Sequence, residues 1–245
     1  MLIHSKLVTF MLVLSLNRQV YAGTIVGGHE AQPHSRPYMV LIERQVQGKI
    51  KFCDGFLLNE DFVMSAAHCL ANAYTVLLGL HEMHNTPGVQ RIPVSQVFPH
   101  KGYNSTVYKN DVMLLKLTFK ANFSKNVRPI DLAGQDDGSL PKSCIVSGWG
   151  KTSRSDIYIS SKLMEVNVTL INDSNCGLEN SYCSEGEVGP AEGDSGGPLV
   201  CEGGKAYGVV SSIFTPHSGG PLIYRYAKIP DKKDWITSTM KNALR

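Results

Sequence analysis

The sequence predicts an all-β fold, and the spacing of its apolar residues carries that prediction. Apolar segments are short, and Gly, Pro, Asn or Asp separates them, as in strands joined by turns. They do not alternate with longer helical patterns, which argues against an α/β sheet. The 245 residues, 42% of them hydrophobic, are enough to bury a large core. The segments expected as strands are Tyr38–Ile42, Phe56–Leu58, Phe62–Met64, Thr75–Leu78, Val112–Leu117, Cys144–Ser147, Val166–Ile171 and Ala206–Ser211.

The segment from Asp231 onward has a different period. Ile236, Met240 and Leu244 recur every four residues, with Trp235 beside them. This spacing gives one apolar face to a short C-terminal helix. We expect that face to pack on the β structure.

The first residues predict a secretory signal. Met1 to Lys6 carries one cation, Leu7 to Leu16 is mostly apolar, and Val20-Tyr21-Ala22 offers small residues at a cleavage site. The apolar run is shorter than the ~20 residues that a membrane span needs. We therefore expect residues 1–22 to be removed from a secreted protein without a membrane span.

The charge balance gives no support for nucleic-acid binding. The formal net charge is +3, and removing residues 1–24, which contain Lys6, Arg18 and no acid, leaves 22 − 21 = +1. A charge this small provides no strong attraction to polyanions.

Six cysteines behind a signal peptide predict up to three disulfides, and the sequence alone leaves 15 pairings open. No CxxC pair exists, and only Cys69 adjoins a histidine, so the spacing does not indicate zinc. In a secreted chain, Asn-x-Ser/Thr sequons are candidate glycan sites. They begin at Asn104, Asn122, Asn167 and Asn172.

Three motifs point to nucleophilic catalysis. The segment 193–198, Gly-Asp-Ser-Gly-Gly-Pro, places a serine among glycines, whose freedom lets backbone N–H groups approach a reacting carbonyl. The segments Ser-Ala-Ala-His-Cys at 65–69 and Asn-Asp-Val-Met-Leu-Leu at 110–115 add a histidine and an aspartate. Together and in this order, the motifs resemble the chymotrypsin-like serine peptidases.

The resemblance extends over nearly all of residues 25–240. The stretches 55–63, 103–117 and 147–152 resemble most closely the granzymes and mast-cell chymases. The resemblance implies two six-stranded antiparallel β-barrels, with His68 and Asp111 on the first barrel and Ser195 on the second. Residues 25–245 are then the peptidase domain, and the protein is expected to be secreted or stored in granules.

The resemblance also assigns roles in acyl transfer. Ser195 would be the nucleophile, His68 the general base and acid, and Asp111 the carboxylate that orients the imidazole. The N–H groups of Gly193 and Ser195 would form the oxyanion hole. Ser211 matches the serine that supports the buried aspartate.

An activation switch is implied at the segment Ile25-Val26-Gly27-Gly28. In the family, the freed isoleucine ammonium enters the protein and pairs with the acid before the nucleophile, here Asp194. Only Gly23-Thr24 separates the expected signal cleavage from Ile25. A dipeptide of this kind resembles the pro-segment of granule peptidases, which a dipeptide-removing aminopeptidase cuts; direct signal cleavage after Thr24 is the alternative.

The resemblance pairs Cys53 with Cys69, Cys144 with Cys201, and Cys176 with Cys183. The bridge that often supports the family's specificity pocket is missing, because Ala191 stands where its first cysteine would be. Granzymes and chymases share that absence. No metal or other cofactor is expected. The segment 81–85, His-Glu-Met-His-Asn, offers one carboxylate where the family's calcium loop uses several.

The resemblance places Gly189 at the base of the specificity pocket, where trypsin-like members carry Asp, so cleavage after Lys or Arg is not expected. Ile213 replaces a wall glycine, and either Leu222 or Tyr224 lies opposite, depending on the alignment. We expect a small or narrowed apolar pocket that prefers Leu, Val, Ala or Met to Phe or Tyr. If Arg225 turned inward, an acidic residue would be preferred instead.

Two classes of function remain open at the level of sequence. The first is a serine endopeptidase that acts as a monomer on protein or peptide substrates, with serpin-type inhibitors as candidate partners. The second is an inactive homologue that uses the fold as a binding module. The intact motifs favour the enzyme, and the altered pocket keeps the alternative open.

Overall fold

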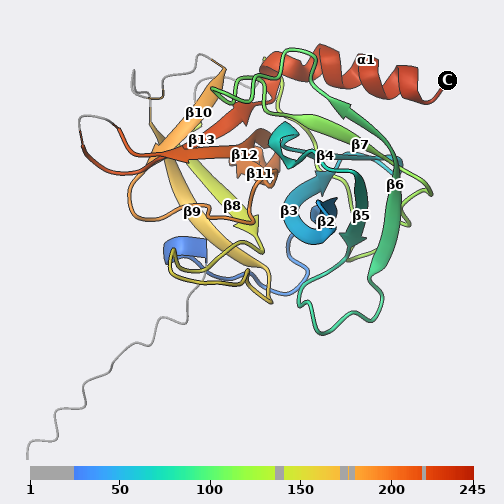
Figure 1. The fold of residues 1–245 in the computed structure, drawn as a ribbon, viewed down its shortest axis with the longest axis horizontal. Coiled ribbons are helices and arrows are strands. Elements are labelled where there is room, and N and C mark those ends of the chain that lie inside the picture. Colours follow the sequence, from blue (N-terminus) through green and yellow to red (C-terminus); the bar gives the residue numbers. More distant parts are fainter. Residues whose placement is uncertain (1–24, 136–140, 172–175, 177–179, 217–218) are drawn as a thin grey trace, which may run out of the picture.

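The computed structural model describes residues 25–135, 141–171, 176, 180–216 and 219–245. Two closed antiparallel β-barrels and one C-terminal α-helix make up the fold (Figure 1), which confirms the predicted all-β class and the two six-stranded barrels. The expected signal peptide, the dipeptide at 23–24 and the sequon at Asn172 lie outside the described residues.

The first barrel closes in the order β2-β3-β4-β7-β6-β5. Val40 pairs with Gly55 on one side and with Leu78 on the other, so β2 joins both ends of the sheet. Strand β4 reads Phe-Val-Met-Ser, and every residue of it is buried. The strands are β2 (Met39–Val46), β3 (Lys49–Leu57), β4 (Phe62–Ser65), β5 (Ala73–Leu78), β6 (Gln90–Pro99) and β7 (Met113–Leu117).

The second barrel closes in the order β8-β9-β10-β13-β12-β11, with β11 paired back to β8. On β9 the alternate residues Met164, Val166, Val168 and Leu170 are buried, as the period of a half-buried strand requires. A short strand, β1 (His29–Glu30), adds to β9. The barrel strands are β8 (Ser143–Gly148), β9 (Met164–Ile171), β10 (Ser181–Glu185), β11 (Pro198–Cys201), β12 (Ala206–Phe214) and β13 (Ile223–Lys228).

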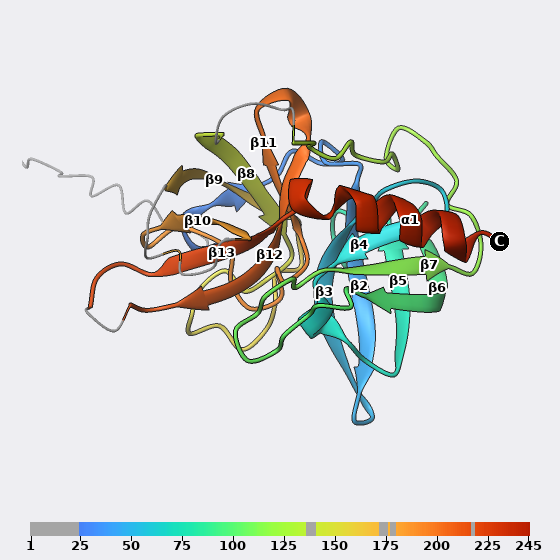
Figure 2. The same ribbon diagram turned by 90° about the horizontal axis from the view of Figure 1, so that it is seen from above.

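Helix α1 (Lys233–Ala243) leaves the second barrel and lies across the first (Figure 2). Ile236 is buried in the core of the first barrel, and Trp235 and Met240 pack against that core. Leu244, expected on the same apolar face, is instead 57% exposed, because the helix ends at Ala243. Within the described residues, no helix is long and apolar enough to cross a membrane.

A third apolar cluster fills the space between the barrels. It includes Met39 and Leu41 of β2 together with Trp149, which follows β8 and is fully buried. The Trp149 indole N–H donates to the His81 carbonyl oxygen at 3.0 Å, so the ring is satisfied in this position. This packing fixes the two barrels relative to each other and thereby positions a cleft between them.

Candidate active site

His68 and Asp111 meet in the first barrel. His68 lies in a 3-10 turn (Ala67–Cys69) that follows β4, and Asp111 precedes β7, the partner of β4. His68 Nδ1 lies 2.7 Å from Asp111 Oδ2, and the His68 backbone N–H donates to Oδ1 at 2.8 Å. The carboxylate therefore holds both the backbone and the ring of the histidine, and it sets Nδ1 as the protonated nitrogen.

Asp111 also receives a hydrogen bond from the second barrel. The Ser211 hydroxyl on β12 donates to Asp111 Oδ2 at 2.6 Å, and both side chains are buried. A buried carboxylate needs such donors because its desolvation is costly. The contact joins the two barrels directly behind His68.

Ser195 faces the same cleft as His68. Both residues line a cavity of about 720 Å³, whose walls include Phe52 and Met83 of the first barrel region and Gly193 of the second. The Ser195 carbonyl oxygen accepts the Asp54 N–H of β3 at 2.8 Å. His68 and Ser195 thus line one cleft, and the buried Asp111 contacts His68.

Gly193 adopts a backbone conformation that suits a glycine, with φ at +107°. A Cβ at this position would stand 2.8 Å from Gly150 Cα and 2.9 Å from Ile159 Cγ2. The Lys151 N–H donates to the Glu192 carbonyl oxygen at 2.8 Å, so the Gly193 N–H of the same peptide points the opposite way. Within the described part of the chain, the Gly193 and Ser195 N–H groups have no hydrogen-bond acceptor.

Asp194 points away from the cleft into the protein. Its carboxyl oxygens accept the Gly150 and Ala191 N–H groups, each at 2.7 Å. Burial raises the pKa of Asp194 to about 7, although the two N–H donors lower it. Ile25, at the start of the described chain, is also fully buried and belongs to the core of the second barrel.

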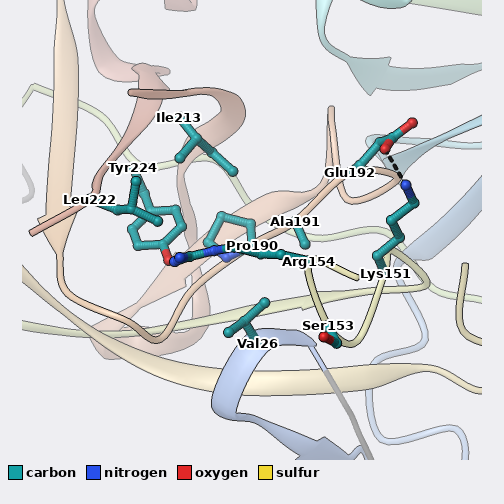
Figure 3. A pocket seen from close by; sticks show the side chains of 10 residues that line it. All are labelled: Val26, Lys151, Ser153, Arg154, Pro190, Ala191, Glu192, Ile213, Leu222 and Tyr224. Atoms are coloured by element: carbon teal, nitrogen blue, oxygen red, sulfur yellow. Dashed lines mark hydrogen bonds and ion pairs between the residues drawn. The ribbon is translucent and has the colours of Figure 1, made fainter. Parts of the chain in front are cut away.

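A pocket of about 300 Å³ lies beside the 189–192 segment (Figure 3). Three of the four residues expected at the pocket are among its lining residues: Ile213, Leu222 and Tyr224. Gly189 packs directly against the Tyr224 ring: a Cβ on Gly189 would stand only 2.7 Å from that ring. The ring therefore fills the space at the base, and Leu222 and Tyr224 both contribute where the sequence left a choice.

Arg154 is a further lining residue, and sequence reasoning did not identify it. Figure 3 shows its side chain crossing the pocket toward the Tyr224 hydroxyl. Burial raises the pKa of Tyr224, and Arg154 acts in the opposite direction. Arg154 also lies 3.4 Å from Glu187. Arg225 points elsewhere: its Nε donates to the Cys176 carbonyl oxygen at 2.8 Å, and its guanidinium stacks on Phe214.

Comparison with known proteins agrees with this geometry. The family model described as Trypsin matches residues 25–236. The chain belongs to the trypsin family. It is 38% identical to granzyme B(G,H) of Mus musculus over 97% of this chain and all of that protein. It is 37% identical to mast cell protease 3 of Ovis aries over 94% of this chain and 95% of that protein. The solved structure described as "Structure of GrC" matches with a TM-score of 0.77 and 37% identity, over 89% of this chain and all of that one.

As a member of the trypsin family with granzyme and mast cell protease relatives, the chain is a serine endopeptidase that is secreted or stored in granules. The structure contains three disulfides, Cys53–Cys69, Cys144–Cys201 and Cys176–Cys183, which are the pairs that the resemblance implies. The sequon residues Asn104, Asn122 and Asn167 are exposed, as glycan attachment requires.

Sequence reasoning also missed Asp54, which is fully buried on β3. Its backbone touches Ser195, and its side chain lies near Asp194. The available signal was an aspartate directly after Cys53, in a segment that otherwise leads into an apolar strand. A charged residue rarely occupies such a position without a partner.

Proposed function

We propose that this endopeptidase cleaves peptide bonds with Ser195 as nucleophile, His68 as general base and acid, and Asp111 as the orienting carboxylate. The observation that carries the proposal is the hydrogen-bonded series from Ser211 through Asp111 to His68, which ends in the cleft that Ser195 lines. Histidine, aspartate and serine in this chain order form the catalytic triad of the chymotrypsin family, from which the roles assigned here are taken.

In this mechanism, His68 Nε2 takes the proton of the Ser195 hydroxyl as the oxygen attacks the scissile carbonyl carbon. Asp111 keeps the proton on Nδ1 and stabilises the imidazolium that forms. The carbonyl oxygen, now negative, accepts hydrogen bonds from the N–H groups of Gly193 and Ser195. His68 then returns the proton to the leaving amine, and water hydrolyses the acyl-enzyme by the same steps.

The proposed switch uses the new N-terminus of Ile25. Cleavage after Thr24 would create an ammonium where Ile25 is already buried, in the same barrel that carries Asp194. A buried carboxylate and a buried ammonium each lose hydration, so their pairing offsets a cost that either would carry alone. The pair would hold the loop that presents Gly193 and Ser195.

We propose that the pocket accepts a compact apolar side chain before the scissile bond. The Tyr224 ring occupies the base, Ile213 and Leu222 narrow the walls, and the volume of about 300 Å³ is small for a binding pocket. Arg154 adds a positive charge, so a Lys or Arg side chain would be repelled as well as desolvated. The charge of Arg154 is partly balanced by Glu187, which favours apolar over acidic side chains. We also propose that the enzyme is a monomer that serpin-type inhibitors capture.

A serine-directed fluorophosphonate tests the catalytic proposal. We expect the form that begins at Ile25 to be labelled on Ser195 and to cleave peptides, whereas Ser195→Ala should show neither reaction. His68→Ala should lower kcat/KM by several orders of magnitude without unfolding the protein, because the triad acts as a unit. A trimmed, folded protein that does not react would instead support the binding-module alternative.

A peptide series that varies only the residue before the scissile bond tests the pocket. Cleavage should favour Leu, Val, Ala and Met. A dominant preference for Lys or Arg would refute the pocket proposal, and a preference for Asp or Glu would show that the Arg154 charge outweighs Glu187.

A further inference from the structure

A second buried carboxyl group lies next to Asp194 and takes no part in the proposed triad. Asp54 is fully buried on β3. Its Oδ2 accepts a hydrogen bond from the Trp149 backbone N–H at 3.1 Å, and its Oδ1 has no hydrogen-bond partner among the described residues. Buried carboxyl oxygens normally have partners, so this atom requires an explanation.

Asp54 and Asp194 border the same small space. A single carbon atom added as a Cβ on Gly148 would overlap both Asp194 Oδ1 and Asp54 Oδ2. Both side chains are fully buried, which leaves no water to screen one charge from the other. Two ionised carboxylates this close are strongly unfavourable, so such pairs retain a proton.

The surroundings indicate which carboxyl group carries the charge. Asp194 receives two short N–H hydrogen bonds, whereas Asp54 receives one longer bond. Burial, followed by the negative charge of Asp194, raises the pKa of Asp54 well above its usual range. These contacts make Asp194 the first of the two groups to lose its proton, near its pKa of about 7, while Asp54 keeps its own.

The other elements packed around the pair supply few groups that titrate. Ser65 on β4 bonds the Asp54 carbonyl oxygen, and Tyr226 on β13 is buried with its hydroxyl bonded to Ser184. Burial, with smaller contributions from Tyr224 and Asp194, raises the pKa of Tyr226, so that hydroxyl stays neutral. The proposed activation switch would add one further charge, the ammonium that cleavage would create at Ile25.

We propose that Asp54 and Asp194 form a buried carboxyl pair that holds one proton and one negative charge, and that Asp54 is a positioning residue for the loop of Gly193 and Ser195. The effect on catalysis rests on the proposed role of Asp194 in activation. With Asp54 neutral, one ammonium at Ile25 meets one carboxylate, and the buried charges balance. The Asp54 N–H meanwhile donates to the Ser195 carbonyl oxygen, so one residue approaches both Asp194 and Ser195.

The pair makes stability depend on pH with a definite sign. The folded chain keeps a proton on Asp54, whereas the unfolded chain releases it above about pH 4. The stability that Asp54 contributes is therefore fully present below the unfolded pKa and is lost as the pH rises toward the folded pKa. One retained proton lowers the folding equilibrium constant by up to about tenfold for each pH unit.

Urea unfolding of the full chain tests this pair without any turnover. The Ser195→Ala chain is compared with the same chain carrying Asp54→Asn, between about pH 5 and pH 8, where an unfolded Asp is ionised. As the pH rises, the folding equilibrium constant of the parent should fall faster than that of the Asn variant. The difference should be up to about tenfold for each pH unit. Asp61→Asn, on a partly exposed aspartate of the same barrel, is the matched control and should keep the parent's slope. Equal slopes for parent and Asp54→Asn would overturn the proposal.

Two further measurements test the proposal separately. The first does not require the Asn variant to fold, and the second tests the effect on catalysis alone. Isotope-edited infrared spectra of the parent should contain a neutral-aspartate band at pH 7, and its absence would also overturn the shared proton. In the trimmed enzyme, Asp54→Asn should extend activity to higher pH, because Asn cannot add a second buried charge. An unchanged pH profile would overturn the positioning role. Absence of all activity in the trimmed parent would contradict the proposed triad and leave the unfolding result standing.

Discussion

Replacing Gly193 with Ala tests the proposed oxyanion hole at one carbon atom. The added Cβ would lie 2.8 Å from Gly150 Cα and 2.9 Å from Ile159 Cγ2, so the backbone of the loop must move. The φ of +107° adds strain of about 1–3 kcal/mol for a residue with a side chain. Both effects displace the Gly193 N–H from the position where it would meet the developing oxyanion.

Loss of one such donor lowers kcat by about 10²–10³-fold, equivalent to about 2.7–4 kcal/mol. We expect this loss for Gly193→Ala in steady-state cleavage of a peptide, with KM changed much less. Gly203→Ala is the matched control, because Gly203 also has a positive φ, of +79°, but has no neighbouring atom within 4 Å of an added Cβ. The control should lose stability and keep its kcat. A Gly193→Ala enzyme that retains kcat within a few-fold of the parent would refute the assigned oxyanion hole.

Three other changes test the remaining parts of the site. Ser211→Ala removes the 2.6 Å donor to a buried carboxylate and should lower the free energy of unfolding by about 1.5–3 kcal/mol, measured in urea; an unchanged value would show that the bond contributes nothing. Tyr224→Gly should empty the base of the pocket and shift cleavage toward Phe and Tyr, and a peptide series with an unchanged order would contradict the proposed filling. A chain that keeps Gly23-Thr24 should fold but remain almost inactive until a dipeptide-removing aminopeptidase exposes Ile25; full activity before trimming would rule out the switch.

The strands that could be predicted from the sequence are those whose own residues carry the signal. Phe62–Met64 is continuously apolar and became β4, and the alternating residues of β9 are buried on one face. Strand β6 was not identified, because it contains Pro93 and most of its side chains are at least partly exposed. Strands β10 and β11 are short, and their partners rather than their composition define them.

The candidate site divides in the same way. The segments around His68, Asp111 and Ser195 are local motifs, so each could be found from adjacent residues. Asp54 could not be assigned, because its relation to Asp194 exists only after the two barrels pack together. Arg154 lies in a loop, and nothing in the neighbouring sequence indicates that its side chain reaches the Tyr224 hydroxyl.

Each of the three disulfides joins two residues of the same barrel, and all six cysteines are used. The barrels are therefore joined by the chain itself, by packing and by hydrogen bonds such as Ser211 to Asp111, and by no disulfide. Helix α1 lies across the first barrel, and the Lys116 ammonium donates to the Ala243 carbonyl oxygen in its last turn. Mechanical force or proteolysis within α1 could therefore separate the two barrels while all three disulfides remain intact. Ser211 and Asp111 then separate while each barrel keeps its strands, so turnover would be an earlier sensor of damage than circular dichroism. Reducing agents, by contrast, would remove the crosslinks within each barrel.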